Sequence, residues 1–387
     1  MYKHEVALSK EVEATLAEIE KNTKNSIPSD VSEVVVREQP KTKQPVSLLK
    51  MNPLLDKQIY GMTVGYDGRH YVFDTTNTFE VYDDIVNDTT PSETGITLTE
   101  RVIHFKVTRE GVVITQNNDA DGTVEVLYSP DINTPFQVVY TSPSDESIYS
   151  TTGPFGIDVY DNGLNVFVLI AIYGRQGTAK DLLLSSDGGK TYKVIKTTTP
   201  LVGHNSHFHD TKFDPYHGFI WVSEGDTTDN HNISFSRDMG ATWEVLTRER
   251  QPTAIMPFPK RVIFGRDHLG TGLDSVVKPT LNKDVMTITP HYELKKGVTA
   301  IRSYAHSPVF DAKEGYISFA QGTDVAPSSI IATGDSGETF YQVFMGEIRG
   351  ANAIGMIFGM DENYIFCSGR SYAGKTQLFY SEKVEWE

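Results

Sequence analysis

The sequence contains a single cysteine, Cys367, among its 387 residues. A disulfide within the chain is therefore excluded, and the apolar residues that precede Cys367 predict a buried thiol. No apolar run approaches the roughly 18 residues that a membrane-spanning helix needs, so we expect no membrane insertion. The first residues, Met1 to Glu5, lack the apolar centre of a signal peptide, so we expect a protein made in the cytoplasm and not secreted by that route.

Positive charge is also scarce. The chain has 35 Lys and Arg against 51 Asp and Glu, which gives a net charge of −16. Such a balance opposes general binding to nucleic acid or to anionic lipid, and we expect neither partner. Tyrosine and phenylalanine are plentiful, with 19 of each, and after Leu55 they occur in short β-type runs separated by Gly, Asn, Asp and Pro, which is an all-β pattern.

Three octapeptides share the pattern hydroxyl-x-Asp-x-Gly-x-Thr-aromatic, at residues 185–192, 236–243 and 333–340. Each lies between two alternating apolar runs, so each predicts a hairpin turn. In such a turn the Asp hydrogen-bonds nearby backbone, the Gly supplies a positive φ, and the aromatic side chain packs beneath the hairpin. The residues to which we assign these structural roles are Asp187, Gly189, Asp238, Gly240, Trp243, Asp335 and Gly337.

These octapeptides resemble the Asp box, or BNR repeat, of sialidase-like β-propellers. The resemblance implies an all-β propeller in which each box joins the third and fourth strands of a blade, on the face away from the active site. Weaker copies that keep the Asp and the aromatic residue occur around Asp74 and Asp131.

The spacing of the boxes predicts the number of blades. Successive Asp residues are separated by 57, 56, 51 and 97 residues, and the last interval predicts one blade without a box, at residues 262–294. Units of about 40–50 residues match four-stranded propeller blades. We expect six blades, with five as the alternative, and we expect residues 79–83 to complete the last blade beside residues 351–360, 364–368 and 377–381.

The domain organisation follows from composition. Residues 1–22 have helical apolar spacing and predict an amphipathic helix, residues 23–54 predict a polar linker or arm, and residues 55–387 predict the propeller. An isolated helix of this length must dock on another surface. We expect residues 1–53 to bind a neighbouring subunit or to self-associate as a short coiled coil, with docking of the helix on its own propeller as the alternative.

Candidate ligand-binding residues come from loops on the face opposite the boxes. A Gly followed by Arg or Asp recurs between the expected second and third strands, and two further arginines occur near the starts of later units. These charges either bind a ligand or are solvated loop residues. The candidates are Arg175, Asp226, Arg266, Asp267, Arg302, Arg349 and Arg370.

A histidine cluster at His204, His207 and His209 leads into an expected inner strand. His207 and His209 lie on one side of a strand, where they would bind a divalent metal, form a hydrogen-bonded pair that orders the strand, or supply a general base. We expect no other cofactor.

Catalytic sialidases, to which the Asp boxes point, use three arginines, a Tyr–Glu pair, an Asp acid and an Arg-Ile-Pro motif. No Arg-Ile-Pro occurs in this sequence, and Tyr304 is the nearest candidate nucleophile. We therefore assign no catalytic residue and expect binding without cleavage.

The chain is similar in outline to receptor-binding proteins of phage tails, in which a propeller is carried on a stem. The resemblance implies a virion protein whose propeller binds a host cell-wall glycan and whose N-terminal residues contact other tail or baseplate subunits. The alternatives are a sialidase-like glycoside hydrolase and a structural propeller that serves virion assembly.

Overall fold

The computed structural model describes residues 43–55, 57–100, 102–118, 120–143, 156–172, 180–198, 207–225, 231–266, 272–280, 282–293, 298–305, 312–321, 328–346, 353–370 and 376–387. These residues lie in one compact unit that begins at Thr42, and residues 1–41 form a separate unit. The helix expected at residues 1–22 lies outside the described residues. No helix within the described ranges is long and apolar enough to span a membrane.

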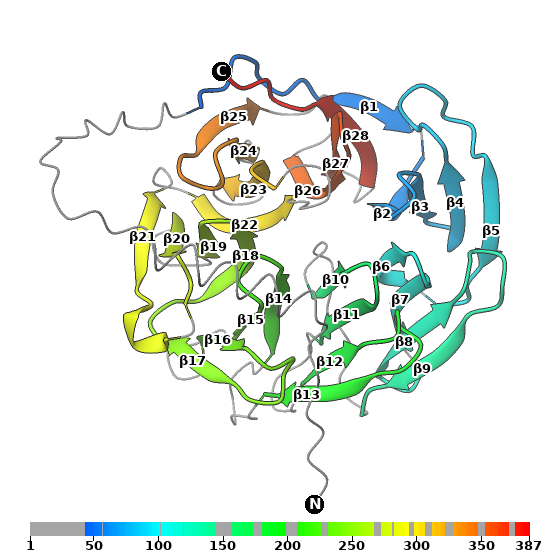
Figure 1. Cartoon of the computed structure of the whole chain (residues 1–387). Coiled ribbons are helices and arrows are strands. Elements are labelled where there is room, and N and C mark those ends of the chain that lie inside the picture. The colour runs from blue at the N-terminus through cyan, green and yellow to red at the C-terminus, as the bar shows by residue number, and fades with distance from the viewer. Residues whose placement is uncertain are drawn as a thin grey trace, which may run out of the picture. The chain divides into compact units, whose positions relative to one another are not determined.

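The described strands form seven antiparallel sheets of four strands each, arranged as blades around an axis (Figure 1). We name them blades A to G in chain order. The expectation of an all-β propeller is confirmed, and the expectation of six blades is wrong. The missed blade is blade A, because residues 59–97 form a complete sheet of their own.

The strands of the first four blades follow in order from the axis outward. Blade A has β2 (Ile59–Val64), β3 (His70–Asp74), β4 (Thr78–Tyr82) and β5 (Glu93–Thr97). Blade B has β6 (Val102–Thr108), β7 (Gly111–Asn118), β8 (Thr123–Ser129) and β9 (Gln137–Thr141). Blade C has β10 (Ile157–Asp161), β11 (Val166–Ala171), β12 (Asp181–Ser185) and β13 (Lys193–Thr197). Blade D has β14 (Phe208–Asp214), β15 (Phe219–Glu224), β16 (Asn232–Ser236) and β17 (Glu244–Thr247).

The remaining blades repeat this order, except that the last takes its outermost strand from the start of the unit. Blade E has β18 (Pro252–Phe258), β19 (Arg261–Arg266), β20 (Gly272–Val277) and β21 (Ile288–Glu293), with the 3-10 helix η1 (Lys283–Val285) before β21. Blade F has β22 (Val298–Ala305), β23 (Gly315–Gln321), β24 (Ser328–Thr333) and β25 (Tyr341–Gly346). Blade G has β26 (Ala353–Met360), β27 (Tyr364–Arg370), β28 (Thr376–Glu382) and β1 (Asn52–Leu55).

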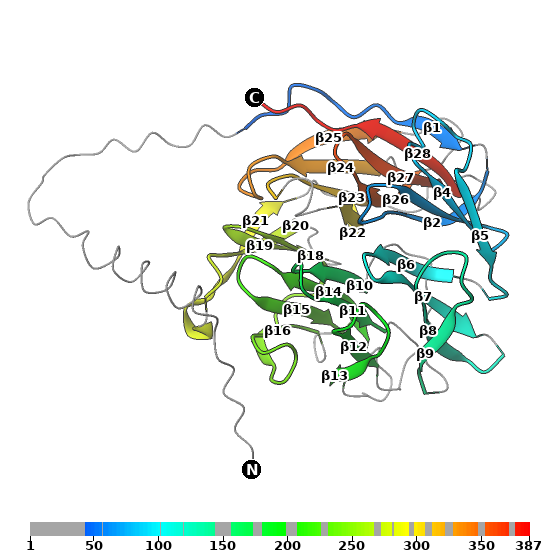
Figure 2. The ribbon, with the colours of Figure 1, turned by 45° about the vertical axis from the view of Figure 1, so that its right-hand side comes forward.

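Blade G closes the ring with strands from both ends of the unit. β1 pairs antiparallel with β28 at the outer edge, as both views of the ribbon show (Figure 2). The antiparallel pairing of the two chain segments continues beyond these strands, where Gln44 and Glu387 exchange two backbone hydrogen bonds of 3.0 Å. Residues 79–83, expected to close this blade, instead contribute to β4 in blade A. The stretch expected as a linker, residues 23–54, therefore includes part of the closing strand, which removes a free sheet edge.

Each pair of neighbouring blades encloses its own hydrophobic core. Successive side chains of one strand point to the two flanking interfaces: Ile220 of β15 packs against blade C, whereas Trp221 packs against blade E. This explains why the central strands are apolar on both faces instead of alternating with polar residues. A core joins blade G to blade A as well, so the ring is continuous.

The up-and-down order of the four strands in each blade determines which connections lie on the same face of the propeller. Consecutive turns of an antiparallel sheet lie at opposite ends of its strands. Turns between first and second strands therefore lie on one face with the turns between third and fourth strands, which we call the box face. Connections from second to third strands, and from one blade to the next, lie on the other face, which we call the open face.

Candidate functional site

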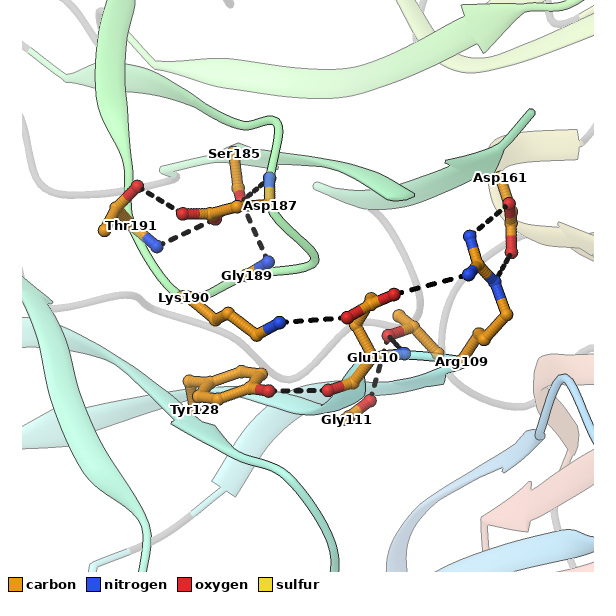
Figure 3. Close-up of polar contacts among 11 residues, drawn as sticks. Arg109, Glu110, Gly111, Tyr128, Asp161, Ser185, Asp187, Gly189, Lys190 and Thr191 are labelled. Carbon is orange, nitrogen blue, oxygen red and sulfur yellow. Dashed lines mark hydrogen bonds and ion pairs between the residues drawn. The ribbon is translucent and has the colours of Figure 1, made fainter. Parts of the chain in front are cut away.

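The three good Asp boxes form the hairpins β12–β13, β16–β17 and β24–β25, on the box face. In the first, the Asp187 carboxylate accepts hydrogen bonds from Ser185 Oγ (2.7 Å), Thr191 N (3.0 Å) and Thr191 Oγ1 (2.6 Å), and Ser185 Oγ accepts one from Gly189 N (2.8 Å) (Figure 3). The same bonds recur around Asp238 and Asp335. The hydrogen bonds to each of these carboxylates therefore come from residues of its own octapeptide.

The boxes also contact the preceding blade. Lys190 of the blade C box forms an ion pair with Glu110 of blade B at 2.9 Å, and Arg109 beside it pairs with Asp161 at 2.9 Å (Figure 3). In blade D, Trp243 Nε1 donates to Ile195 O of blade C at 2.8 Å. These contacts bond neighbouring blades together on the box face.

The two weaker boxes lie in different kinds of turn. Asp131 lies between β8 and β9, the third and fourth strands of blade B, and accepts hydrogen bonds from Asn133 N and Thr134 N. Asp74 makes similar bonds to Thr76 N and Thr78 N, but between β3 and β4, the second and third strands of blade A. Its turn therefore lies on the open face, which explains why counting from Asp74 missed a blade.

His207 and His209 are both buried, at the open-face end of β14. His209 Nδ1 lies 3.1 Å from Pro252 O, and its Nε2 lies 2.9 Å from His207 Nε2. Because a carbonyl only accepts, His209 carries a proton on Nδ1, and one of the two facing Nε2 atoms donates to the other. This pair joins blade D to blade E, and the described residues contain no group of three or more His, Cys, Asp or Glu that could hold a metal.

Glu224 lies at the open-face end of β15, near these histidines in sequence register, and its carboxylate has partners in two blades. Lys196 Nζ of blade C lies 3.0 Å from Glu224 Oε1, and Asn232 Nδ2 donates to the same oxygen. Lys196 also lies over the rings of Phe208 and Trp243. Glu224 therefore bonds blade C to blade D.

An arginine pair surrounds a buried carboxylate at the open-face end of blade E. Arg250 Nε and Arg266 Nε lie 3.3 and 3.4 Å from Asp274 Oδ2, and Arg266 Nη2 donates to Glu293 Oε1 at 2.8 Å. Gly272 leaves the space that Arg266 occupies, because a Cβ there would collide with the guanidinium and would lie 2.5 Å from Tyr292 O. We call Arg250, Arg266, Asp274 and Glu293 the arginine cluster.

The arginine cluster has unused hydrogen-bonding capacity. Asp274 is fully buried, yet neither of its oxygens forms a hydrogen bond, because the contacts to Arg250 and Arg266 lack the required angles. Burial raises the pKa of Asp274, although the two guanidinium groups oppose this. Buried atoms at neighbouring open-face strand ends also have no hydrogen bond: Ser223 Oγ, His231 Nδ1 and Thr253 Oγ1. Buried polar atoms are seldom left without a hydrogen bond in native proteins, and water, an ion or a ligand can supply the partner.

The other expected ligand-binding residues are only partly placed. Arg302 lies within β22 and Arg370 at the end of β27, where it is paired with Ala353 and Thr376, but only their backbones are described. Arg175, His204, Asp226, Asp267 and Arg349 lie outside the described residues. Of the expected set, the structure places the side chains of His207, His209 and Arg266 at the open-face ends of blades D and E.

Sequence reasoning missed Asp274 and Lys196 as parts of this region. A charged residue inside the apolar strand Leu273 to Val277 was a usable signal, since buried carboxylates are rare without a cation. Lys196 gave no such signal, because it looks like an ordinary lysine of an outer strand.

The sequence matches no protein family model and no curated protein. Its fold is similar to that of solved propellers. YCF48 from Cyanidioschyzon merolae has 15% identity and a TM-score of 0.55, over 87% of this chain and 98% of that one. The β-propeller domain of Cps50 (Swd1) from Myceliophteria thermophila has 9% identity and a TM-score of 0.56, over 86% and 98%. At these identities the likeness shows the fold alone.

Proposed function

We propose that this chain is a sialidase-like Asp-box propeller that binds a glycan without cleaving it, through the open-face ends of blades D and E. The observation that carries the proposal is the arginine cluster with its buried, unsatisfied Asp274. Sugar hydroxyl groups donate and accept hydrogen bonds, so they can satisfy such a mixed set of buried donors and acceptors.

Binding is favoured over hydrolysis by the state of the carboxylates. Glycoside hydrolysis needs two carboxyl groups, or a nucleophile with its carboxylate partner, facing the substrate. In the described part of this region Asp274 lies between two guanidinium groups, Glu293 bonds Arg266, and Glu224 bonds Lys196. Each of these carboxylates forms an ion pair within the protein, although Asp274 accepts no hydrogen bond.

The biological setting that we propose is the tail of a phage. The support is the similarity in outline to phage receptor-binding proteins, together with a separate N-terminal unit, residues 1–41, ahead of the propeller. In this proposal the N-terminal unit attaches the chain to tail or baseplate subunits, and the glycan belongs to the host cell wall. Added in excess, the full-length chain should lower adsorption of the phage that carries it.

The glycan proposal is tested with the full-length chain and purified cell-wall glycan fractions from candidate bacteria. Arg266→Ala should weaken binding by about tenfold or more, which corresponds to about 1.4 kcal/mol. Arg261→Ala is a matched control, because Arg261 begins the same strand at the box face and its side chain is 13% exposed against 14% for Arg266. Binding should survive in this variant.

Three outcomes would contradict the proposal. Equal losses in the two arginine variants, at unchanged melting temperature, would remove the arginine cluster from the site. Absence of saturable binding to every wall fraction would favour a structural assembly role. Release of reducing sugar by the native chain would show hydrolysis.

A further inference from the structure

A second polar cluster lies on the innermost strands, away from the arginine cluster. Lys212 of β14 donates from Nζ to Asp158 Oδ1 of β10 at 3.1 Å, and the other oxygen of Asp158 accepts from Phe213 N at 2.8 Å. Lys106 of β6 interacts electrostatically with both Lys212 and Asp158. Three successive blades, B, C and D, therefore each contribute one charged side chain.

The position of Lys106 follows from these partners. Blades B and D are not neighbours in the ring, so an interaction between Lys106 and Lys212 must run on the axis side of blade C. The innermost strands of a propeller surround its central channel, and β6, β10 and β14 are innermost in their sheets (Figure 1). Lys106 is half-buried and pairs in register with Val113, whose side chain lies between blades B and C, so Lys106 lies on the side of β6 that faces blade C.

Lys106 has no counterion of its own. Among the described residues it forms no hydrogen bond or ion pair. The neighbouring strands offer little negative charge to balance the ammonium group of Lys106. β2 and β7 contain no charged residue, and Asp161 of β10 is bonded to Arg109. Asp158 is bonded to Lys212, and Asp210, which also attracts Lys212, is occupied by the backbone of Thr211 and Ile255.

The environment penalises the charge on Lys106. Burial first, and then the repulsion from Lys212, lower the pKa of Lys106 to about 8, and attraction to Asp158 only partly offsets this. His104, two residues away on β6, has a pKa lowered to about 3, mainly by burial. It is therefore neutral at pH 7 and can donate one ring N–H. A half-buried ammonium ion without a counterion, beside a second ammonium ion and a neutral donor, favours an anion.

We propose that Lys106 and Lys212, with His104, form a binding site for a small oxyanion of the sulfate and phosphate class on the propeller axis. The bound anion supplies the missing counterion of Lys106 and is held by groups from blades B and D. The site is independent of the glycan proposal, since it shares no residue with the arginine cluster.

Isothermal titration of the full-length chain with sodium sulfate, against sodium chloride at equal ionic strength, tests this site. Native protein should bind about one sulfate saturably at about pH 7, and Lys106→Met should weaken binding by about tenfold or more. Lys106→Arg should retain it, because the charge remains. Lys193→Met is the matched control, since Lys193 is exposed on the outer strand β13 and its loss removes the same charge.

The pH dependence separates this site from general salt effects. Sulfate keeps its charge between about pH 7 and pH 9.5, so a fall in affinity over that range reports loss of the lysine proton. The fall should occur in native protein and be absent in Lys106→Arg. No saturable sulfate binding by native protein, or native affinity in Lys106→Met, would overturn the proposal. Circular dichroism on each variant shows that the comparison is between folded proteins.

Discussion

Asp187 lies in the Asp-box turn of blade C, whereas Asp274 lies near the open-face end of a strand in blade E. The carboxylate of Asp187 accepts three hydrogen bonds from residues within four positions of it, and Asp274 accepts none. Burial raises the pKa of each carboxyl; at Asp187 the hydrogen bonds from Thr191 and Ser185 prevail and lower it, whereas at Asp274 burial prevails. The same side chain therefore stabilises the fold at one place and retains binding capacity at the other.

The box turns should tolerate substitution less well than the open-face strand ends. Gly240 provides the strongest test. Its φ is +84°, and a Cβ there would lie 2.6 Å from Ile195 Cβ of the neighbouring blade. Gly240→Ala should lower the free energy of unfolding by about 3 kcal/mol, from backbone strain and overpacking together. Denaturant titration measures the loss.

Gly218 provides the control within the same blade. Its φ is +73°, but a Cβ there meets nothing within 4 Å. Gly218→Ala should cost only the backbone strain, about 1 kcal/mol. Equal losses at the two glycines would show that the close contact with blade C does not matter.

The second test removes a carboxylate that accepts three hydrogen bonds. Asp187→Ala leaves the turn without its three hydrogen bonds and should lower the free energy of unfolding by about 2 kcal/mol at neutral pH. Because the folded pKa of Asp187 is depressed, its contribution is present above the unfolded pKa of about 4 and is lost as the pH falls through the folded pKa. The difference between native and variant should therefore shrink in acid, and a difference that grows there would contradict this account.

The third test predicts a gain in the free energy of unfolding instead of a loss. The folded pKa of Asp274 is raised, so ionisation of this carboxyl destabilises the fold at neutral pH; the cost shrinks as the pH falls through the folded pKa and is gone below the unfolded pKa of about 4. Asp274→Asn should raise the free energy of unfolding by about 1 kcal/mol at pH 7, while glycan binding weakens. Thermal melting at several pH values measures the first effect, and a destabilised variant would show that the arginines depend on this carboxylate.

The hairpin turns at the three octapeptides could be predicted from the sequence because their contacts are local. Each Asp, Gly and hydroxyl group of a box serves its own octapeptide, so the pattern is complete in the sequence. The same locality caused the wrong blade number, because Asp74 makes equivalent local bonds in a turn between second and third strands. A local pattern does not identify which hairpin of a blade it joins.

The arginine cluster could be predicted only in part, because its contacts are not local. Arg266 was a candidate from its position after a Gly, but its partners Asp274 and Glu293 come from two other strands, and Arg250 comes from the preceding connection. Ring closure by β1 was missed for the same reason: it joins residues 52–55 to the end of the chain.

The most direct measurement is hydrogen–deuterium exchange of the full-length chain with and without a saturating glycan. The account predicts slower exchange in peptides from 207–225, 250–266 and 272–277, and unchanged exchange in the box turns at 236–243 and 333–340. Protection confined to the box turns, with the strand ends of blades D and E unaffected, would contradict the claim that the open face binds the ligand.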